Sequence, residues 1–280
     1  MEQAQKYERL RALHGGERAF VIPNAWDAGS ARLLTSLGFA ALATTSAGYA
    51  FSVGKRDSTA GLSRQEILQN AAQIVAATGL PVSGDLEDGF GTAPEACAKT
   101  IAMASQIGLV GGTIEDATGD PDAPIYEVSH AVDRIQAAVE AARGRDFLLT
   151  ARAENFICGR PDLADTIRRL QAFEEAGADV LYAPGLPDLE AIRTVCQSVG
   201  KPVNVVMGLV SFTCSVTDLS EAGVSRISVG GSFARAAIGA MMRAAREVQE
   251  QGTFTYSQQA IPDSVVRQIM SQTHDPQRED

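Results

Sequence analysis

Residues 147–183 have the sequence FLLTARAENFICGRPDLADTIRRLQAFEEAGADVLYA, and this stretch decides the fold. An apolar run, Phe147–Ala151, is followed by a helical pattern over Leu163–Ala176 and by a second apolar run, Val180–Ala183. Gly177 separates the helix from the second run, and glycine suits the left-handed position that follows a helix. Apolar runs without alternation are typical of parallel strands covered on both faces. The stretch therefore predicts a strand–helix–strand unit.

The same unit recurs along the whole chain. Gly38 and Gly223 also precede expected strands, and Ser63 with Glu66 forms an S-x-x-E capping box at a helix start. The expected strands are Phe20–Pro23, Ala40–Thr44, Pro81–Gly84, Gly112–Ile114, Phe147–Ala151, Val180–Ala183, Val203–Val206 and Arg226–Val229. The expected helices are Ala28–Leu37, Arg64–Thr78, Pro94–Ile107, Ser129–Ala142, Leu163–Ala176, Leu189–Ser198, Thr217–Ala222 and Ser232–Gln251. Eight such units favour an α/β fold of the (β/α)8 TIM-barrel type over a doubly wound open sheet.

The length of 280 residues would allow two average domains, but an α/β barrel of this size is a single domain. We expect one barrel domain over residues 1–280, with an N-terminal helix in 1–18, the barrel in 19–251 and a C-terminal helical extension in 252–280. Within the extension, Val265, Val266, Ile269 and Met270 fall on one face of a predicted helix. This face predicts packing either on the chain's own barrel or on a neighbouring subunit.

The composition excludes several classes of protein. Asp and Glu number 34 against 24 Lys and Arg, which gives a formal net charge of −10. Nucleic acids bind basic surfaces, so we expect no nucleic-acid partner. No apolar run approaches the roughly 18–20 residues of a membrane helix, and the N-terminus lacks the apolar core of a secretory signal. The four cysteines form no CxxC pair, which is typical of a cytoplasmic chain with reduced thiols.

Common catalytic motifs are also missing from the sequence. The three histidines fall in predicted helical or tail segments, which disfavours a Ser–His–Asp triad and a histidine zinc site. There is no GxGxxG after a strand and no GxxxxGK[ST]. No lysine ends a predicted strand, so a Schiff-base nucleophile is not expected.

Charged residues instead gather at the carboxyl ends of the expected strands, where barrel enzymes place their active sites. Asp85 and Glu87 follow the third strand and would share one side of an extended chain, and Glu115 ends the fourth strand. Three converging carboxylates need a cation. An all-oxygen set suits Mg²⁺, with Mn²⁺ as an alternative, so Asp85, Glu87 and Glu115 are the candidate metal ligands. Arg152 ends the fifth strand and could bind a substrate carboxylate.

The end of the second strand offers a further anion-binding site. Thr45, Ser46 and the backbone amides around Ala47 and Gly48 could hold a second anionic group of a substrate. The segment from Ala47 to Ser63 that follows is longer than a connection needs and contains Asp57, another candidate functional residue. The alternative for each charged residue is a solvated loop start or a structural ion pair.

These residues also carry a family resemblance. The ordered motifs are Thr45-Ser46, Gly54–Ser58, Gly84–Gly91, Ile114–Asp116, Ala151–Glu154 and Glu175–Asp179. Together they resemble the isocitrate lyase/phosphoenolpyruvate mutase superfamily over about Ala19 to Ala245. The resemblance implies a barrel whose eighth helix is exchanged between the subunits of a homodimer or homotetramer.

The resemblance also implies a division of roles in the site. Mg²⁺ would lie near Asp85, with Glu87 and Glu115 acting through water. Arg152 and the Thr45–Gly48 loop would bind the carboxylate of a 2-oxo acid. Asp57 matches an aspartate in the mobile region near the substrate.

Two departures from the family motifs limit the expected activity. The loop Ala117–Tyr126 after the fourth strand lacks the Lys-Lys-Cys-Gly-His run of lyase members and the lysine and asparagine of phosphonate-handling members. Ala183-Pro184-Gly185 stands where the mutases carry histidine. These differences argue against isocitrate lyase, methylisocitrate lyase and ordinary phosphonomutase activity.

The remaining residues favour a Mg²⁺-dependent lyase. It would cleave the C–C bond next to the carbonyl or hydroxyl carbon of a small 2-oxo or 2-hydroxy carboxylate through a metal-stabilised enolate, as in oxaloacetate decarboxylation. Asp57, Glu115 and Arg152 are the candidate catalytic residues, and Glu115, Asp57 or Tyr126 could be the base that a retro-aldol cleavage needs. The alternatives are a P–C mutase or hydrolase acting on a phosphonopyruvate-like substrate, and a protein that binds a 2-oxo acid without turnover.

Overall fold

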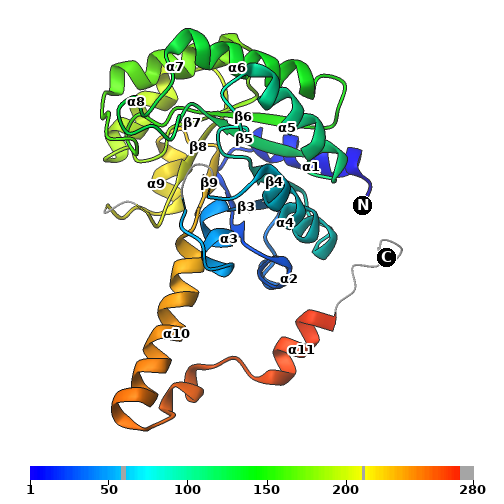
Figure 1. The fold of residues 1–280 in the computed structure, drawn as a ribbon, viewed down its shortest axis with the longest axis vertical. Helices are drawn as coiled ribbons and strands as arrows, with labels where there is room; N and C mark the ends of the chain where they lie inside the picture. The colour runs from blue at the N-terminus through cyan, green and yellow to red at the C-terminus, as the bar shows by residue number, and fades with distance from the viewer. Residues whose placement is uncertain (58–60, 210–211, 272–280) are drawn as a thin grey trace.

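The strands of the chain form one parallel sheet that curls into a nearly closed barrel (Figure 1). The computed structural model describes residues 1–57, 61–209 and 212–271. The strands are β1 Phe20–Ile22, β2 Asn24–Ala25, β3 Leu42–Thr44, β4 Val82–Asp85, β5 Gly111–Glu115, β6 Leu148–Arg152, β7 Val180–Tyr182, β8 Val203–Val206 and β9 Arg226–Ser228. They pair in the order β1-β9-β8-β7-β6-β5-β4-β3-β2. This arrangement confirms the predicted barrel and excludes the open sheet.

The first expected strand is divided in two, and the division closes the barrel. β1 pairs with β9 while β2 pairs with β3, and only Pro23 lies between β1 and β2. Proline has no N–H to donate to a ladder, but the Pro23 carbonyl oxygen still accepts from the Ala43 amide at 2.9 Å. β1 and β2 together therefore act as one of eight barrel strands.

The helices lie outside the sheet and follow the predicted pattern closely. They are α1 Gln3–His14, α2 Ala28–Ser36, α3 Ser46–Ser52, α4 Arg64–Ala77, α5 Pro94–Gln106, α6 Val128–Ala142, α7 Leu163–Glu175, α8 Leu189–Ser198, α9 Val216–Glu221, α10 Ser232–Gln251 and α11 Asp263–Ser271, with a 3-10 turn η1 over Thr255–Gln259. The predicted capping box is confirmed, since the Ser63 amide donates to Glu66 Oε2 at 2.8 Å and the Glu66 amide donates back to Ser63 Oγ. Gly38, Gly177 and Gly223 have φ of 83°, 101° and 96°, as expected after a helix.

Helix α3 was not predicted, and it lies at the start of the segment that follows the second expected strand. Residues 47–63 were expected to be a long loop, of which residues 58–60 lie outside the described residues. Its first part is helical because Thr45 caps the helix, with Thr45 Oγ1 accepting from the Gly48 amide at 3.2 Å. A seven-residue helix is too short for sequence periodicity to reveal.

Helix α1 covers the amino-terminal end of the barrel. Its Leu10 is fully buried and belongs to an apolar cluster with Ile22, Ala41, Val110 and Leu148. The cluster fills one end of the barrel. The strand ends that carry the acidic residues form the other end, which stays open.

The eighth helix leaves the body of the molecule. α10 projects away from the barrel, and α11 returns toward α2 (Figure 1). Ala234 is the one fully buried residue of α10, whereas Met241 is 65% exposed. α11 packs on its own chain at its last turn, where Arg32 Nη1 donates to the Met270 carbonyl oxygen at 2.5 Å. Residues 272–280 of the expected extension lie outside the described residues.

Within the described ranges, no helix has both the length and the apolar character needed to cross a membrane.

Candidate active site

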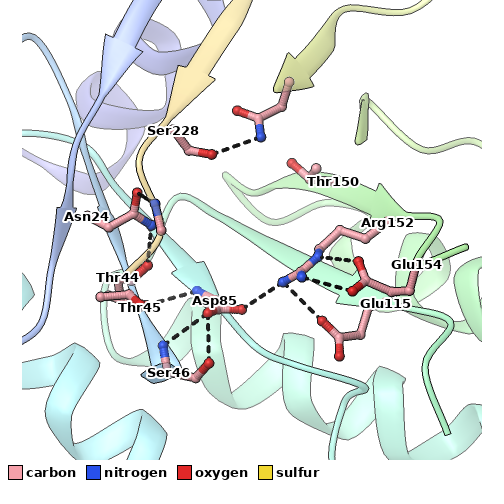
Figure 2. A network of polar contacts seen from close by, with 12 residues as sticks. Asn24, Thr44, Thr45, Ser46, Asp85, Glu115, Thr150, Arg152, Glu154 and Ser228 are labelled. Atoms are coloured by element: carbon pink, nitrogen blue, oxygen red, sulfur yellow. Dashed lines mark hydrogen bonds and ion pairs between the residues drawn. The ribbon is translucent and has the colours of Figure 1, made fainter. Parts of the chain in front are cut away.

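Asp85 ends β4 and stands at the centre of a polar network in the open end of the barrel (Figure 2). Its Oδ2 accepts from both the amide and the hydroxyl of Ser46, each at 3.0 Å. Its Oδ1 accepts from Arg152 Nη1 at 3.1 Å, and its own amide donates to Thr44 Oγ1 at 2.8 Å. The start of α3 and the end of β6 therefore fix this carboxylate, while β3 fixes the backbone amide of Asp85.

Arg152 is surrounded by carboxylates rather than free for a substrate. Its Nη1 lies 3.1 Å from Asp85 Oδ1 and 3.0 Å from Glu115 Oε2. Glu154 accepts from Nε at 2.9 Å and from Nη2 at 3.2 Å, and the ring of Tyr182 lies 5.0 Å from the guanidinium carbon. Burial acts to lower the pKa of Arg152, but the carboxylates outweigh it and hold the pKa above its usual range. Arg152 is a permanent cation here, and its assignment to a substrate carboxylate stays a prediction.

Glu154 is a member of the site that the sequence analysis did not single out. The residue is 1% exposed, and its amide donates to Asp116 Oδ1 at 2.8 Å. Asp116 Oδ2 in turn accepts from Arg169 Nη1 at 3.0 Å, so a second buried ion pair supports the first. The alternation argument that paired Asp85 with Glu87 also applies to Arg152 and Glu154, and it would have found this residue.

The prediction that Glu87 continues an extended strand from Asp85 is wrong, although Glu87 does line the site. β4 ends at Asp85, and Glu87 has a left-handed backbone with φ of 48° instead of continuing an extended strand. Such a conformation is strained for a residue with a side chain, and strain of this kind gathers at functional sites. Glu87 Oε2 is buried and has no hydrogen-bond partner among the described residues. Burial, reinforced by the charges of Asp85, Asp57 and Asp88, raises the pKa of Glu87 to about 8.

A cavity of about 730 Å³ opens above these residues, which is a usual size for a small-molecule site. The predicted residues that line it are Thr45, Ser46, Ala47, Asp57, Asp85, Glu87, Glu115 and Arg152. Gly48 is outside this lining, because its amide is used by Thr45 and a side chain there would meet Trp26 Cβ at 2.9 Å. Tyr126 is also outside the lining, with the Arg134 guanidinium carbon 4.4 Å from the centre of its ring. Tyr126 is therefore not placed at the cavity wall, and its role as a base stays a prediction.

The donor set fits a hard divalent cation. Asp57, Asp85, Glu87, Glu115 and Glu154 line the mouth of the cavity, while Arg152 is the one guanidinium among them. Burial raises the pKa of Glu115 despite Arg152 beside it, so a further cation would be needed for every carboxylate of the group to be ionised. Oxygen ligands and surplus negative charge are what Mg²⁺ and Mn²⁺ require. No three such side chains converge on one point in the described ranges, since Arg152 Nη1 lies between Asp85 and Glu115.

Cys158 is a further lining residue that sequence spacing could not reveal. It lies in the loop after β6, and its amide donates to the Glu154 carbonyl oxygen at 2.9 Å. Burial, followed by the charge of Glu154, raises the pKa of its thiol to about 12. The cavity therefore holds a thiol that is protonated at neutral pH.

The barrel and its acidic mouth define a class of protein, the (β/α)8 barrels that carry their functional site at the carboxyl ends of the strands. Residues 10–249 match the family model described as phosphoenolpyruvate phosphomutase. The chain belongs to this family, within the isocitrate lyase/phosphoenolpyruvate mutase superfamily. The resemblance inferred from the sequence motifs is thereby confirmed.

The relatives of the chain include both lyases and mutases. A crystal structure from Burkholderia cenocepacia, provisionally described as a lyase/mutase, is 54% identical and covers 96% of this chain and 97% of its own, with a TM-score of 0.94. The 2-methylisocitrate lyase of Escherichia coli is 30% identical, over 69% of this chain and 67% of the enzyme. The oxaloacetate decarboxylase of Ectopseudomonas mendocina is 26% identical, over 70% of this chain and 68% of the enzyme.

Proposed function

We propose that the chain is a divalent-metal-dependent lyase that cleaves the C–C bond beside the carbonyl or hydroxyl carbon of a small 2-oxo or 2-hydroxy carboxylate. The observation that carries the proposal is the surplus of carboxylates at the mouth, among them Glu87, whose Oε2 has no partner in the described part of the chain. The similarity to an oxaloacetate decarboxylase and to a 2-methylisocitrate lyase supports the same class of reaction.

Asp85 and Glu87 would hold the cation: Glu87 Oε2 has no partner among the described residues, and Asp85 lies at the centre of the mouth, where it shares Arg152 with Glu115 and Glu154. When bound, the cation would supply positive charge where the keto oxygen becomes negative during bond cleavage. Ser46 orients Asp85 through its amide and its hydroxyl. Arg152 favours the ionised form of the surrounding carboxylates and adds a fixed positive charge to the mouth.

The proton steps can be met by groups of the cavity wall. Asp57 lines the mouth and can accept the hydroxyl proton that a retro-aldol cleavage releases. Decarboxylation needs no such base. The product carbanion equivalent needs one proton afterwards, and the Cys158 thiol or water can supply it.

A product assay tests the proposal against its rivals. The protein with Mg²⁺ is offered oxaloacetate, a 2-hydroxy acid of the methylisocitrate type, and phosphonopyruvate, and the products are identified by NMR. We expect pyruvate from oxaloacetate or a 2-oxo acid from the hydroxy acid, lost on removing the metal with EDTA. Conversion of phosphonopyruvate alone would replace the lyase by P–C chemistry. Tight binding of all three without turnover would indicate a binding protein.

We also propose that α10 and the segment through α11 pack on a second copy of the chain, in a homodimer or homotetramer. Met241, Met242 and Phe254 are 65%, 45% and 62% exposed, which leaves an apolar surface on a helix that its own barrel does not cover. Light scattering coupled to size exclusion should give twice or four times the 29.5 kDa of one chain. The double variant Met241→Glu/Met242→Glu should lower this mass with unchanged helical circular dichroism. A monomeric wild type at micromolar concentration would contradict the proposal.

A further inference from the structure

A second arginine lies deep inside the barrel, below the acidic mouth. Arg226 is the first residue of β9 and is 3% exposed. It lines the same cavity as Asp85 and Arg152, so the cavity continues from the mouth into the barrel interior. Small side chains leave this space open, since Ala43 and Ser83 line it from the strands opposite.

The partners of Arg226 are all neutral. Its Nε donates to Asn204 Oδ1 at 2.8 Å, its Nη2 donates to Thr150 Oγ1 at 3.0 Å, and its Nη1 lies 3.4 Å from His14 Nε2. Burial, together with the charge of Arg226, lowers the pKa of His14 to about 3, so the imidazole carries no charge at neutral pH. Among the described residues, no carboxylate lies within ion-pair distance of this guanidinium.

A buried guanidinium without a counter-charge is costly, because burial removes its hydration and neutral hydrogen bonds compensate only in part. Its five N–H groups have three partners in the described part of the chain, which leaves two donors. Thr113 supplies a second unmet group: its Oγ1 is buried and has no partner among the residues that the structure describes, and the residue lines the same cavity. Thr113 and Thr150 are directly paired on neighbouring strands, so both hydroxyls belong to one level of the barrel.

We infer that Arg226 forms an anion subsite on the floor of the cavity that takes one carboxylate-sized monoanion. The anion would come either from the far carboxylate of a substrate held at the mouth or from a free monoanion. Arg226 bonds to Thr150, which stands two residues before Arg152 on β6, so these two positions of the strand lie roughly 7 Å apart. Three C–C bonds of about 1.5 Å and a C–O bond of about 1.2 Å at each end let an extended four-carbon dicarboxylate reach across a similar distance. The substrate origin rests on the proposed function, whereas the subsite itself does not.

Anion binding is tested first, without metal and without turnover. The thermal midpoint of the wild type is followed in a chloride-free MOPS buffer as sodium formate replaces MOPS at constant ionic strength. We expect a rise of about 2–3 °C when formate exceeds its Kd about tenfold. Arg226→Met should abolish the rise, and Arg193→Met, which changes an exposed arginine of α8, should keep it. If Arg226→Met fails to fold, Arg226→Lys should show a rise reduced by at least half. An absent rise in the wild type, or an equal rise in the Arg226 variant, overturns the inference.

A second arm distinguishes the two sources of the anion. If the far carboxylate of the substrate occupies the subsite, Arg226→Met should raise the KM for oxaloacetate about 10- to 100-fold with little change in kcat. If a free anion occupies it, the KM should stay within twofold while the formate effect is lost. If the protein turns over none of its candidate substrates, the KM cannot be measured. Displacement of bound formate by succinate is then measured instead. The floor site can thus be established or rejected even if the proposed lyase activity fails.

Discussion

Arg152 and Arg226 both line the cavity inside the barrel, but their electrostatic surroundings are opposite. Arg152 lies within 3.1 Å of oxygens from Asp85, Glu115 and Glu154. Arg226 contacts only neutral groups in the described part of the chain. The mouth therefore has surplus negative charge and the floor has surplus positive charge. A cation at the mouth and an anion at the floor would neutralise both surpluses. A carboxylate substrate bound to a metal ion has this charge pattern.

The largest effect should come from the acid at the centre of the mouth. Asp85→Asn keeps the shape of the side chain but removes a charge that the proposed metal site needs. We expect the metal-dependent activity to fall by about 10³-fold, measured as initial rate at saturating Mg²⁺. Asp133→Asn, which changes an exposed acid of α6, is the matched control. Full activity and unaltered Mg²⁺ dependence in Asp85→Asn would exclude this residue as a metal ligand.

The second effect compares the two arginines in stability. Arg152→Met leaves three buried carboxylates without their cation and should cost about 3–5 kcal/mol in the free energy of unfolding at pH 8. The cost should shrink toward pH 5, because protonation neutralises those carboxylates. Arg226→Met loses hydrogen bonds to neutral groups and should cost about 1–3 kcal/mol at both pH values. Urea unfolding at pH 5 and pH 8 measures the loss in the free energy of unfolding for each variant. The same pH dependence in the two variants would contradict the proposed difference in electrostatic surroundings.

A third effect is the response of the metal-free protein to pH. The pKa of Glu87 is raised to about 8 from 4.5, so the folded state holds a proton that the unfolded state releases. The free energy of unfolding should therefore decrease as the pH rises from about 4.5 to 8 in EDTA. Glu87→Gln should flatten this decrease, as measured by urea unfolding. A wild type that gains stability over this range would show that other groups dominate.

The smallest effect is expected from two paired threonines on the floor. Thr150 Oγ1 accepts from Arg226 Nη2 at 3.0 Å, whereas Thr113 Oγ1 has no partner among the described residues. Thr150→Val should cost about 1–3 kcal/mol, since it deprives a buried donor of its partner. Thr113→Val should change the free energy of unfolding by less than about 1 kcal/mol. Equal losses in anion-free buffer would mean that Thr113 has a partner of its own in solution.

The contrast between mouth and floor also shows how far sequence patterns reach. The acids and Arg152 were predicted because strand ends are recognisable and the ends of parallel strands meet at one end of a barrel. The ladder pairs Glu115 directly with Arg152, as that logic requires. The alternation within a strand could also have found Glu154.

Other features depend on contacts that no spacing encodes. Arg226 begins its strand, and only the barrel geometry shows that it faces inward toward Thr150. Glu87 lines the site through a left-handed backbone, which strand alternation cannot foresee. Gly48 matched a substrate-binding loop, but its amide is used for the cap of α3. Local sequence patterns therefore predicted the barrel and the strand ends that form the site. Long-range packing decided the direction of individual side chains.

The central claim, a divalent cation held by the acids of the mouth, is tested most directly by titrating the metal-free protein with Mg²⁺ in a calorimeter at pH 7. Two buffers of different ionisation enthalpy reveal any proton exchange. We predict one Mg²⁺ per chain with release of a proton, because Glu87 is protonated before the cation binds. Asp85→Asn should weaken or abolish the binding. The account would be contradicted by the absence of saturable Mg²⁺ or Mn²⁺ binding, or by equal binding in Asp85→Asn.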